Sequence, residues 1–325
     1  MLKFFKTLFK VIFGTIGTII GLAITLFIVA NLAKFLIYDD YYKIESNICV
    51  NPGLDDGFVC QGVCVSEERG KILISGYMDD QSNSRIYVVD IKTDSYYYVK
   101  LERSGKLYRG HAGGIATSGN NVYLSSGAKL YLLQLSDLLV ANNGDTIDMG
   151  TGVPVNNAAD YVYCDESYIY VGEFHHTKGG YEKEHNYDSK EGMHHAIVSK
   201  YSHESILNFD GKNVPTPEKI YSIREKVQGV CFTPDGKVVL STSYSIDHSY
   251  FYVYNEADAR DSGETLDGAP VYILEDCTKE IKAPAMSEDL DYYNGLVITV
   301  YENASNKYFY GKLFFANEVN GLDIK

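Results

Sequence analysis

A short strand-turn-strand phrase returns about five times along this chain, and it constrains the fold more than any other feature. Its copies begin at Gln61, His111, Asp160, Gln228 and Ser287, spaced roughly 50 to 65 residues apart. A unit of that length cannot bury its own apolar faces and must pack against its neighbours. The sequence therefore predicts an all-β fold, a β-propeller of five four-stranded blades.

The strands of the last two repeats show how the ring is expected to close. Each repeat divides into runs in which β-branched and aromatic residues alternate with polar ones. The fourth repeat should end with an outer strand at 271–274, while the fifth has only three runs, at 288–292, 296–301 and 308–315. Residues 42–50 have no other partner, so we expect them to supply the missing strand and remove the open edge. A sixth blade would have to lie within 178–215, which looks instead like a loop insertion.

The N-terminal segment predicts a membrane anchor. Residues 11–33 carry no charge, and such a run is long enough to cross a hydrocarbon core of about 30 Å as a helix. Lysines precede the run and two aspartates follow it, which by the positive-inside rule places the N-terminus in the cytoplasm. We expect a cytoplasmic basic tail (1–10), a transmembrane signal anchor (11–38) and an extracytoplasmic propeller (39–325) at the cell membrane. A cleaved signal peptide is the alternative, although its apolar core is typically shorter.

Charge and cysteine content limit the partners. The chain has 29 Lys and Arg against 43 Asp and Glu, and the residues after the apolar run hold all of the acids. Such an acidic domain repels nucleic acid and favours cations or neutral ligands. Three of the six cysteines, Cys64, Cys164 and Cys231, hold matching places in their repeats. We expect these to be buried free thiols.

Polar residues mark one face of the predicted ring. In a propeller, the start of each innermost strand and the end of each second strand lie around the same mouth of the central channel. A ligand site needs a few convergent polar groups in a concave setting, although a wet channel would accept the same lining without a ligand. We expect a small polar ligand, a saccharide or a peptide, to contact Gln61, Tyr77, His111, Gln228, Tyr244, Tyr301 and Glu302.

Carboxylates at this face suggest acid and base chemistry. Asp160, Glu173 and Glu288 are the candidate catalytic residues of a glycosidase-like hydrolase. Glu288 stands where Gln61 and Gln228 stand in their blades, and a buried acid without a basic partner has a raised pKa. In the alternative interpretation, backbone amides of a neighbouring blade bind Glu288 and its role is structural. A serine elbow and a phosphate-binding glycine loop are both missing from the sequence.

A histidine-rich stretch lies between residues 173 and 195. Imidazole and carboxylate groups can bind a divalent cation, although the spacing here matches no known metal motif. A lid or a solvated loop is the alternative, and the sequence indicates no other cofactor. The candidate metal ligands are His175, His176, His194 and His195.

The repeated Gln-Gly-Val starts and their second strands resemble five-bladed β-propellers, and in particular uncharacterised membrane-anchored or secreted bacterial propeller proteins. The resemblance covers most of residues 42–316 and concerns strand starts only, so it implies an architecture and no activity. A third possible function is therefore a scaffold whose rim loops hold another envelope protein.

Overall fold

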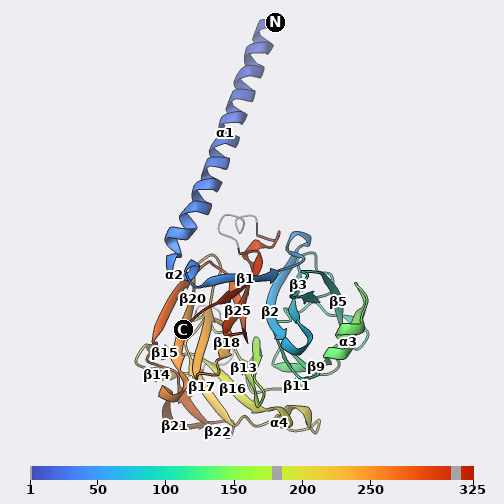
Figure 1. Ribbon diagram of the computed structural model, residues 1–325, viewed down its shortest axis with the longest axis vertical. Coiled ribbons are helices and arrows are strands. Elements are labelled where there is room, and N and C mark those ends of the chain that lie inside the picture. Colours follow the sequence, from blue (N-terminus) through green and yellow to red (C-terminus); the bar gives the residue numbers. More distant parts are fainter. Residues whose placement is uncertain (1, 178–184, 309–315) are drawn as a thin grey trace.

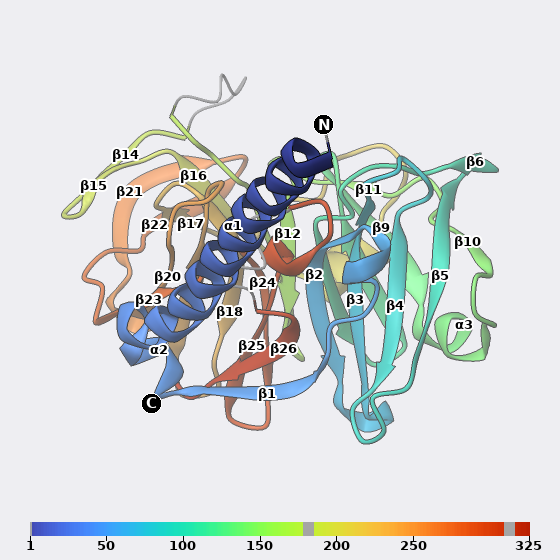
Figure 2. The same cartoon turned by 90° about the horizontal axis from the view of Figure 1, so that it is seen from above.

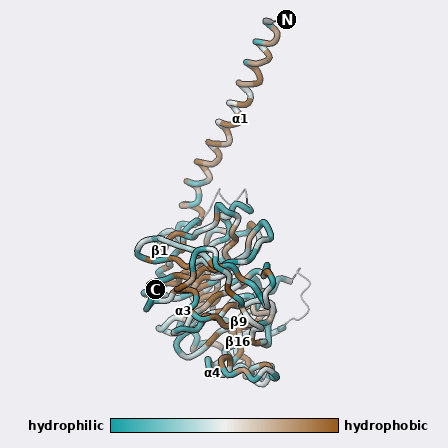
Figure 3. The backbone as a smooth tube through the Cα atoms, turned by 90° about the vertical axis from the view of Figure 1, so that its right-hand side faces the viewer, coloured by the Kyte–Doolittle hydropathy of each residue, from teal (hydrophilic) through white to brown (hydrophobic). Residues whose placement is uncertain are grey.

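The protein is a five-bladed β-propeller that carries one long N-terminal helix, α1 (Leu2–Ile37). Its computed structural model describes residues 2–177, 185–308 and 316–325. Figure 1 shows α1 projecting from one side of the propeller, and Figure 2 shows the blades from above. Helix α1 is long enough and apolar enough to span a membrane. In Figure 3 it is brown over most of its length, as are strands inside the propeller, whereas many loops are teal.

Each blade is built on four antiparallel strands, of which the first lies innermost. Blade one contains β2 (Phe58–Ser66), β3 (Lys71–Met78), β4 (Arg85–Asp90) and β5 (Tyr96–Arg103), extended by β6 (Lys106–Leu107) and β10 (Thr146–Asp148). Blade two contains β7 (Gly114–Ser118), β8 (Asn121–Ser125), β9 (Lys129–Gln134) and β11 (Val153–Pro154). Blade three contains β12 (Tyr161–Cys164), β13 (Tyr168–Gly172), β16 (Ala196–Ser202) and β17 (Lys219–Ile223). Blade four contains β18 (Val227–Phe232), β19 (Lys237–Thr242), β20 (Ser249–Asn255) and β23 (Lys279–Ala283), and blade five β24 (Ser287–Tyr293), β25 (Leu296–Tyr301), β26 (Glu318–Leu322) and β1 (Glu45–Val50).

The expected closure of the ring is confirmed. Strand β1 pairs antiparallel with β26, so that Ser46 lies opposite Gly321. The side-chain amide of Asn320 reinforces this pairing by donating to Glu45 Oε1 (2.5 Å) and to Asn47 Oδ1 (3.2 Å). The N-terminal strand thus removes the open edge of blade five.

The third strand of blade five was predicted wrongly at 308–315. Strand β26 takes that place, with Val297 opposite Leu322. Val319 and Leu322 are fully buried on either side of the blade, which makes this short segment the better core strand. Most of the segment predicted as a strand, residues 309–315, lies outside the described residues.

The outer strand of blade four was also predicted wrongly. Residues 271–274 belong largely to β22 (Ala269–Ile273), which pairs in parallel with β17 of blade three and antiparallel with β21 (Arg260–Leu266). Val271 and Ala269 are buried there against Ile197 and Ile220, and this packing explains the placement. Blade four ends instead with β23, where Ile281 lies opposite Phe251.

Glycines allow the innermost strands to meet backbone to backbone around the axis. A β-carbon at Gly114 would lie 2.4 Å from the backbone nitrogen of Val162, and one at Gly62 would lie 2.8 Å from that of Ile115. At Gly229 it would lie 2.6 Å from the α-carbon of Asp289. The glycine of the repeated phrase is therefore a close-approach position between neighbouring blades.

The base of α1 is fixed to the propeller through α2 (Asp39–Tyr42). The Tyr38 hydroxyl is hydrogen-bonded to His248 Nδ1 at 2.9 Å. Tyr41 is 1% exposed, and its ring packs against Phe251 of blade four and Tyr301 of blade five. All six cysteines are free, including the three expected to be buried thiols.

Removing β1 should destabilise the whole propeller. We expect a chain of residues 51–325 to melt about 10 °C or more below residues 38–325, since losing the closing strand exposes β26 and several buried side chains. Residues 43–325 separate this effect from the loss of Tyr38 and Tyr41, and should melt between the two. Equal melting temperatures for 43–325 and 51–325, measured by circular dichroism, would show that β1 does not close the ring.

Candidate functional site

Most of the predicted site residues meet in one cavity of about 550 Å³. The cavity lies where the innermost strands begin, and all five blades contribute to it. Its lining includes Gln61, Tyr77, His111, Asp160, Gln228, Tyr244, Glu288 and Glu302. Ser126, at the end of a second strand on the same face, lines it as well. Phe174 and Tyr308 also line it, and the sequence did not mark these two as ligand contacts.

Glu288 is the most unusual group in the cavity. Only 4% of the residue is exposed, and it lines the cavity. Within the described ranges 2–177, 185–308 and 316–325, no hydrogen bond or ion pair reaches its carboxylate. Burial raises the pKa of Glu288 well above its ordinary value, and the charges of Glu302 and Asp289 raise it further.

Glu302 is the neighbouring acid, and it is held in place by two donors. The Tyr308 hydroxyl donates to Oε1 at 3.0 Å, and the Gln61 amide donates to Oε2 at 3.1 Å. Burial raises the pKa of Glu302 to about 7, although Tyr308, Lys307 and Gln61 act in the opposite direction. Burial therefore disfavours ionisation of both carboxyl groups, and the charge of Glu302 adds to this effect at Glu288.

Asp160 lies at the mouth of the third blade. Its Oδ2 accepts a hydrogen bond from the Phe174 backbone at 2.7 Å. Burial raises the pKa of Asp160 to about 6; the Phe174 bond lowers it, and the charge of Glu173 raises it. The cavity thus contains a third carboxyl group that titrates near neutral pH.

Flat rings form two walls of the cavity. Tyr77 stacks on His111 with ring centroids 4.9 Å apart, and Tyr244 stacks on His176 at 4.0 Å. Lys307 lies at the rim beside the first pair, with its Nζ 4.6 Å from the centroid of the Tyr77 ring, and it donates to the Tyr77 hydroxyl. Aromatic faces and acidic groups therefore alternate around the mouth.

Among the predicted ligand contacts and catalytic residues, Tyr301 and Glu173 lie outside this cavity. Tyr301 is fully buried against Tyr41, because strand alternation turns it toward blade four while the next residue, Glu302, faces the cavity. Glu173 accepts from the backbone of Ile197 at 3.1 Å and pairs with His185 Nδ1 at 2.5 Å. It lines a separate cavity of about 610 Å³.

The histidine-rich stretch is partly described, since residues 178–184 lie outside the described ranges. His175 stacks on His195 with centroids 5.2 Å apart, whereas His194 contacts Ser189 and Ser222 instead. Among the residues that the structure describes, no group of three or more His, Cys, Asp or Glu side chains is arranged to hold a metal ion. Binding of a divalent cation by these histidines stays a prediction.

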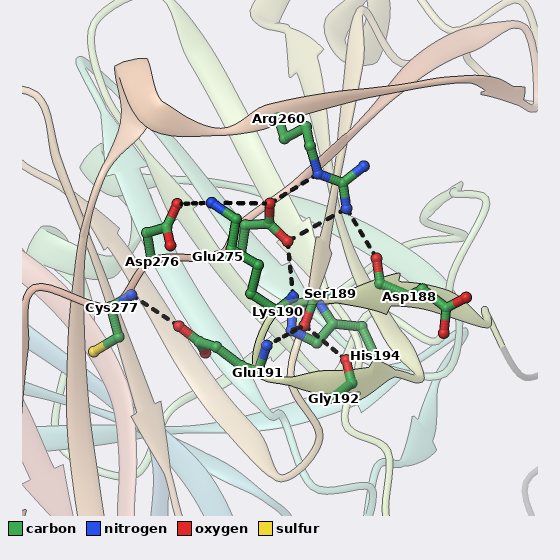
Figure 4. Close-up of polar contacts among 10 residues, drawn as sticks. All are labelled: Asp188, Ser189, Lys190, Glu191, Gly192, His194, Arg260, Glu275, Asp276 and Cys277. Atoms are coloured by element: carbon green, nitrogen blue, oxygen red, sulfur yellow. Dashed lines mark hydrogen bonds and ion pairs between the residues drawn. The ribbon is translucent and has the colours of Figure 1, made fainter.

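The described end of this insertion is a fixed hairpin, β14 (Tyr187–Ser189) and β15 (Gly192–His194) (Figure 4). Glu275 joins it to the β21–β22 ribbon by accepting from the Lys190 backbone at 3.0 Å and from Arg260 Nε at 2.8 Å. Glu191 accepts from the Cys277 backbone at 2.8 Å. These contacts hold the hairpin against residues of blade three and of the segment that leads into the last strand of blade four.

The chain matches no protein-family model and no curated protein. Its fold is similar to a PQQ-bound aldose sugar dehydrogenase from Streptomyces coelicolor, with 15% sequence identity and a TM-score of 0.45 over 79% of this chain and 77% of that chain. It is also similar to RS223-β-xylosidase, with 9% identity and a TM-score of 0.43 over 79% of this chain and 88% of that chain. Hydrazine synthase from Kuenenia stuttgartiensis is similar as well, with 11% identity and a TM-score of 0.37. That match covers 74% of this chain and only 55% of the hydrazine synthase chain. The fold assignment itself rests on the strand topology described above.

We expect the free energy of unfolding to fall as pH rises from about 6.5 to 8. Burial raises the pKa of Glu302 and of Asp291 to about 7, whereas unfolded carboxyls titrate near 4. Over this range the folded protein releases protons that the unfolded chain has already lost, so the free energy of unfolding decreases. His194, whose pKa is lowered to about 4 by burial, acts in the opposite direction only below about pH 6.5.

Thermal melting across this pH range measures the effect. The variant Glu302→Gln should show a shallower decline, because one raised carboxyl is removed while Gln61 and Tyr308 keep a partner of the same shape. A melting temperature that rises with pH over this range in the parent protein would contradict the assigned pKa shifts.

Proposed function

We propose that this chain is a membrane-anchored, extracytoplasmic propeller that binds a small polar ligand, a saccharide or a peptide, at the mouth of its channel. The observation that carries the proposal is the single cavity to which all five blades contribute aromatic, amide and carboxyl groups. Its volume of about 550 Å³ falls within the range that small-molecule sites occupy.

The lining suits a ligand with both flat apolar faces and polar edges. The rings of Tyr77 and Tyr244 offer surfaces on which a sugar ring or a peptide group can stack. Gln61, Gln228 and the carboxyl groups supply hydrogen bonds around its edge. Of the three carboxylates considered for hydrolysis, Asp160 and Glu288 line this cavity and Glu173 does not.

Ligand binding should depend on the aromatic wall. We expect saturable binding from a panel of mono- and disaccharides and dipeptides, measured by saturation-transfer NMR and calorimetry. Tyr244→Ala should weaken it about tenfold, equivalent to roughly 1.4 kcal/mol, because a stacking face is lost. Tyr96→Ala, at an exposed position on the outer strand β5, is the matched control and should bind as the parent does. Absence of binding across the panel, or equal affinities for both variants, would refute the proposal.

The anchor follows from α1 and its flanks. Lys3, Lys6 and Lys10 precede the apolar run and Asp39 and Asp40 follow it, which supports a cytoplasmic N-terminus. The contacts of Tyr38 and Tyr41 would then hold the propeller close to the extracytoplasmic surface of the membrane that α1 spans.

This orientation predicts which end of the chain is accessible. In intact cells, an impermeant label should reach a tag placed after Lys325 and should not reach a tag placed before Met1. The reverse pattern would show that the propeller lies in the cytoplasm. Release of the propeller from the membrane without the tag placed before Met1 would show cleavage after the span.

A further inference from the structure

The cavity has an unbalanced charge distribution. Asp160, Glu288 and Glu302 all line it, whereas the Lys307 ammonium group lies at its rim. The two glutamates come from blade five, Glu288 from β24 and Glu302 from the short 3-10 turn Glu302–Ala304 that follows β25, and the charge of Glu302 raises the pKa of Glu288. A ligand that enters this cavity therefore meets acidic groups at its inner end.

Glu288 differs from the neighbouring acids because no residue that the structure describes donates a hydrogen bond to it. Its neighbour Asp289 accepts from the Ile115 backbone at 3.2 Å, and Glu302 accepts from Gln61 and Tyr308. Glu288 has no such bond from any residue within the described ranges, although it is 4% exposed. Buried carboxylates normally have paired partners, so a carboxyl group that no described residue pairs is a candidate position for a ligand.

Lys307 shows what kind of partner the surrounding rings accept. Its ammonium nitrogen lies 4.6 Å from the ring centroid of Tyr77 and 5.1 Å from that of Tyr308. Both tyrosines line the cavity. An amine held against aromatic faces, with Glu302 nearby, is a favourable cation-π arrangement. The chain's own lysine thus occupies the rim in the way that a ligand amine would occupy the interior.

We propose that the ligand carries a positively charged amine, and that this ammonium group binds to Glu288 and Glu302 against the rings of Tyr77 and Tyr308. The inference rests on the proposed ligand-binding function of the same cavity and names the chemistry of its ligand. An amino sugar and the N-terminus of a peptide share this group. Charge-assisted hydrogen bonds from the ammonium supply Glu288 with the donor that it lacks.

A neutral ligand cannot compensate the two acids in this way. Hydroxyl groups can donate to one carboxylate, but they leave the repulsion between Glu288 and Glu302 in place. An ammonium group both donates hydrogen bonds and neutralises charge, so its advantage over a matched neutral group should be large inside the cavity.

The affinity should increase as pH rises from 5.5 to 7.5. Glu288 faces Glu302, Asp289 and the Cys60 thiol, while Glu302 faces Tyr308, Lys307, Gln61 and Tyr77. Protonation of the two glutamates at low pH removes the charge that attracts the amine. Binding should also release protons, because a bound cation favours the ionised carboxylates.

The test uses the full chain in detergent and two matched pairs of probes, with calorimetry as the measurement. Glucosamine is compared with N-acetylglucosamine, and glycinamide with N-acetylglycinamide, so that each pair differs by the charge of one amine. We expect the charged member of at least one pair to bind ten times or more tighter than its acetylated partner at pH 7.5. The pair that shows the preference identifies an amino sugar or a peptide amine as the source.

Variants connect this preference to the two glutamates. Glu288→Gln should remove the preference for the amine, so that the charged and the acetylated probe bind with affinities within about twofold of each other. Glu67→Gln, at the opposite mouth of the channel, is the charge-matched control and should keep the preference. If Glu288→Gln does not fold, Lys307→Gln provides a second test: it removes the resident amine and should tighten binding of the charged probe severalfold.

Each alternative result is distinct. Equal affinities within both pairs would overturn the ammonium site while leaving ligand binding by the cavity intact. Binding of Ca²⁺ or Mg²⁺ that depends on Glu288, without binding of either amine, would overturn it in favour of a metal site. Failure of all four probes and of the wider saccharide and peptide panel would overturn both the ammonium site and the proposed function.

Discussion

The direct contact of innermost strands at glycine is the constraint on which the rest of the structure depends. At Gly62, Gly114 and Gly229, any side chain would collide with the backbone of the neighbouring blade. Close approach at these points fixes how five sheets surround one axis, and the candidate cavity lies where the innermost strands begin. The polar residues just before and after these glycines are thereby brought together from positions more than 200 residues apart, such as Gln61 and Glu302, which are hydrogen-bonded.

Two adjacent acids of β24 have different roles: Asp289 stabilises the fold, and Glu288 lines the cavity. Asp289 is fully buried and accepts from the Ile115 backbone, so it connects blade five to blade two across the ring. The structural role considered for Glu288 from sequence, a bond to the backbone of another blade, thus belongs to Asp289. Glu288 is free of that role, and its carboxylate is directed at the cavity. Among the described residues, no hydrogen bond to Glu288 offsets the free energy that its burial costs. Acids perturbed in this way are common at functional sites.

Sequence reasoning predicted the inner strands well and the outer strands poorly. The Gln-Gly-Val starts, polar turns and alternating apolar residues are local signals, and they located the cavity residues in every blade. The partner of an outer strand is chosen by long-range packing: 271–274 joined blade three because Val271 is buried against Ile197 and Ile220, far earlier in the chain. Tyr301 and Glu302 were both assigned to the site, but adjacent residues at a strand end face opposite ways, and parity at that end was not visible in the sequence. The placement of Glu173 outside the cavity was not visible in the sequence either, because its carboxylate accepts from the Ile197 backbone and this contact depends on how β16 pairs.

The channel mouth holds a buried acid, Glu288, that has no partner among the described residues, and we propose that it binds a cation. Carbon-13 NMR of the glutamate side-chain carboxyls, assigned with Glu288→Gln and Glu302→Gln, measures this most directly. The account predicts two resonances that titrate well above the ordinary value of about 4.3 and that shift to lower pKa when the amine probe binds. If both residues titrated near 4.3 and did not respond to the amine, the account of this cavity would be contradicted.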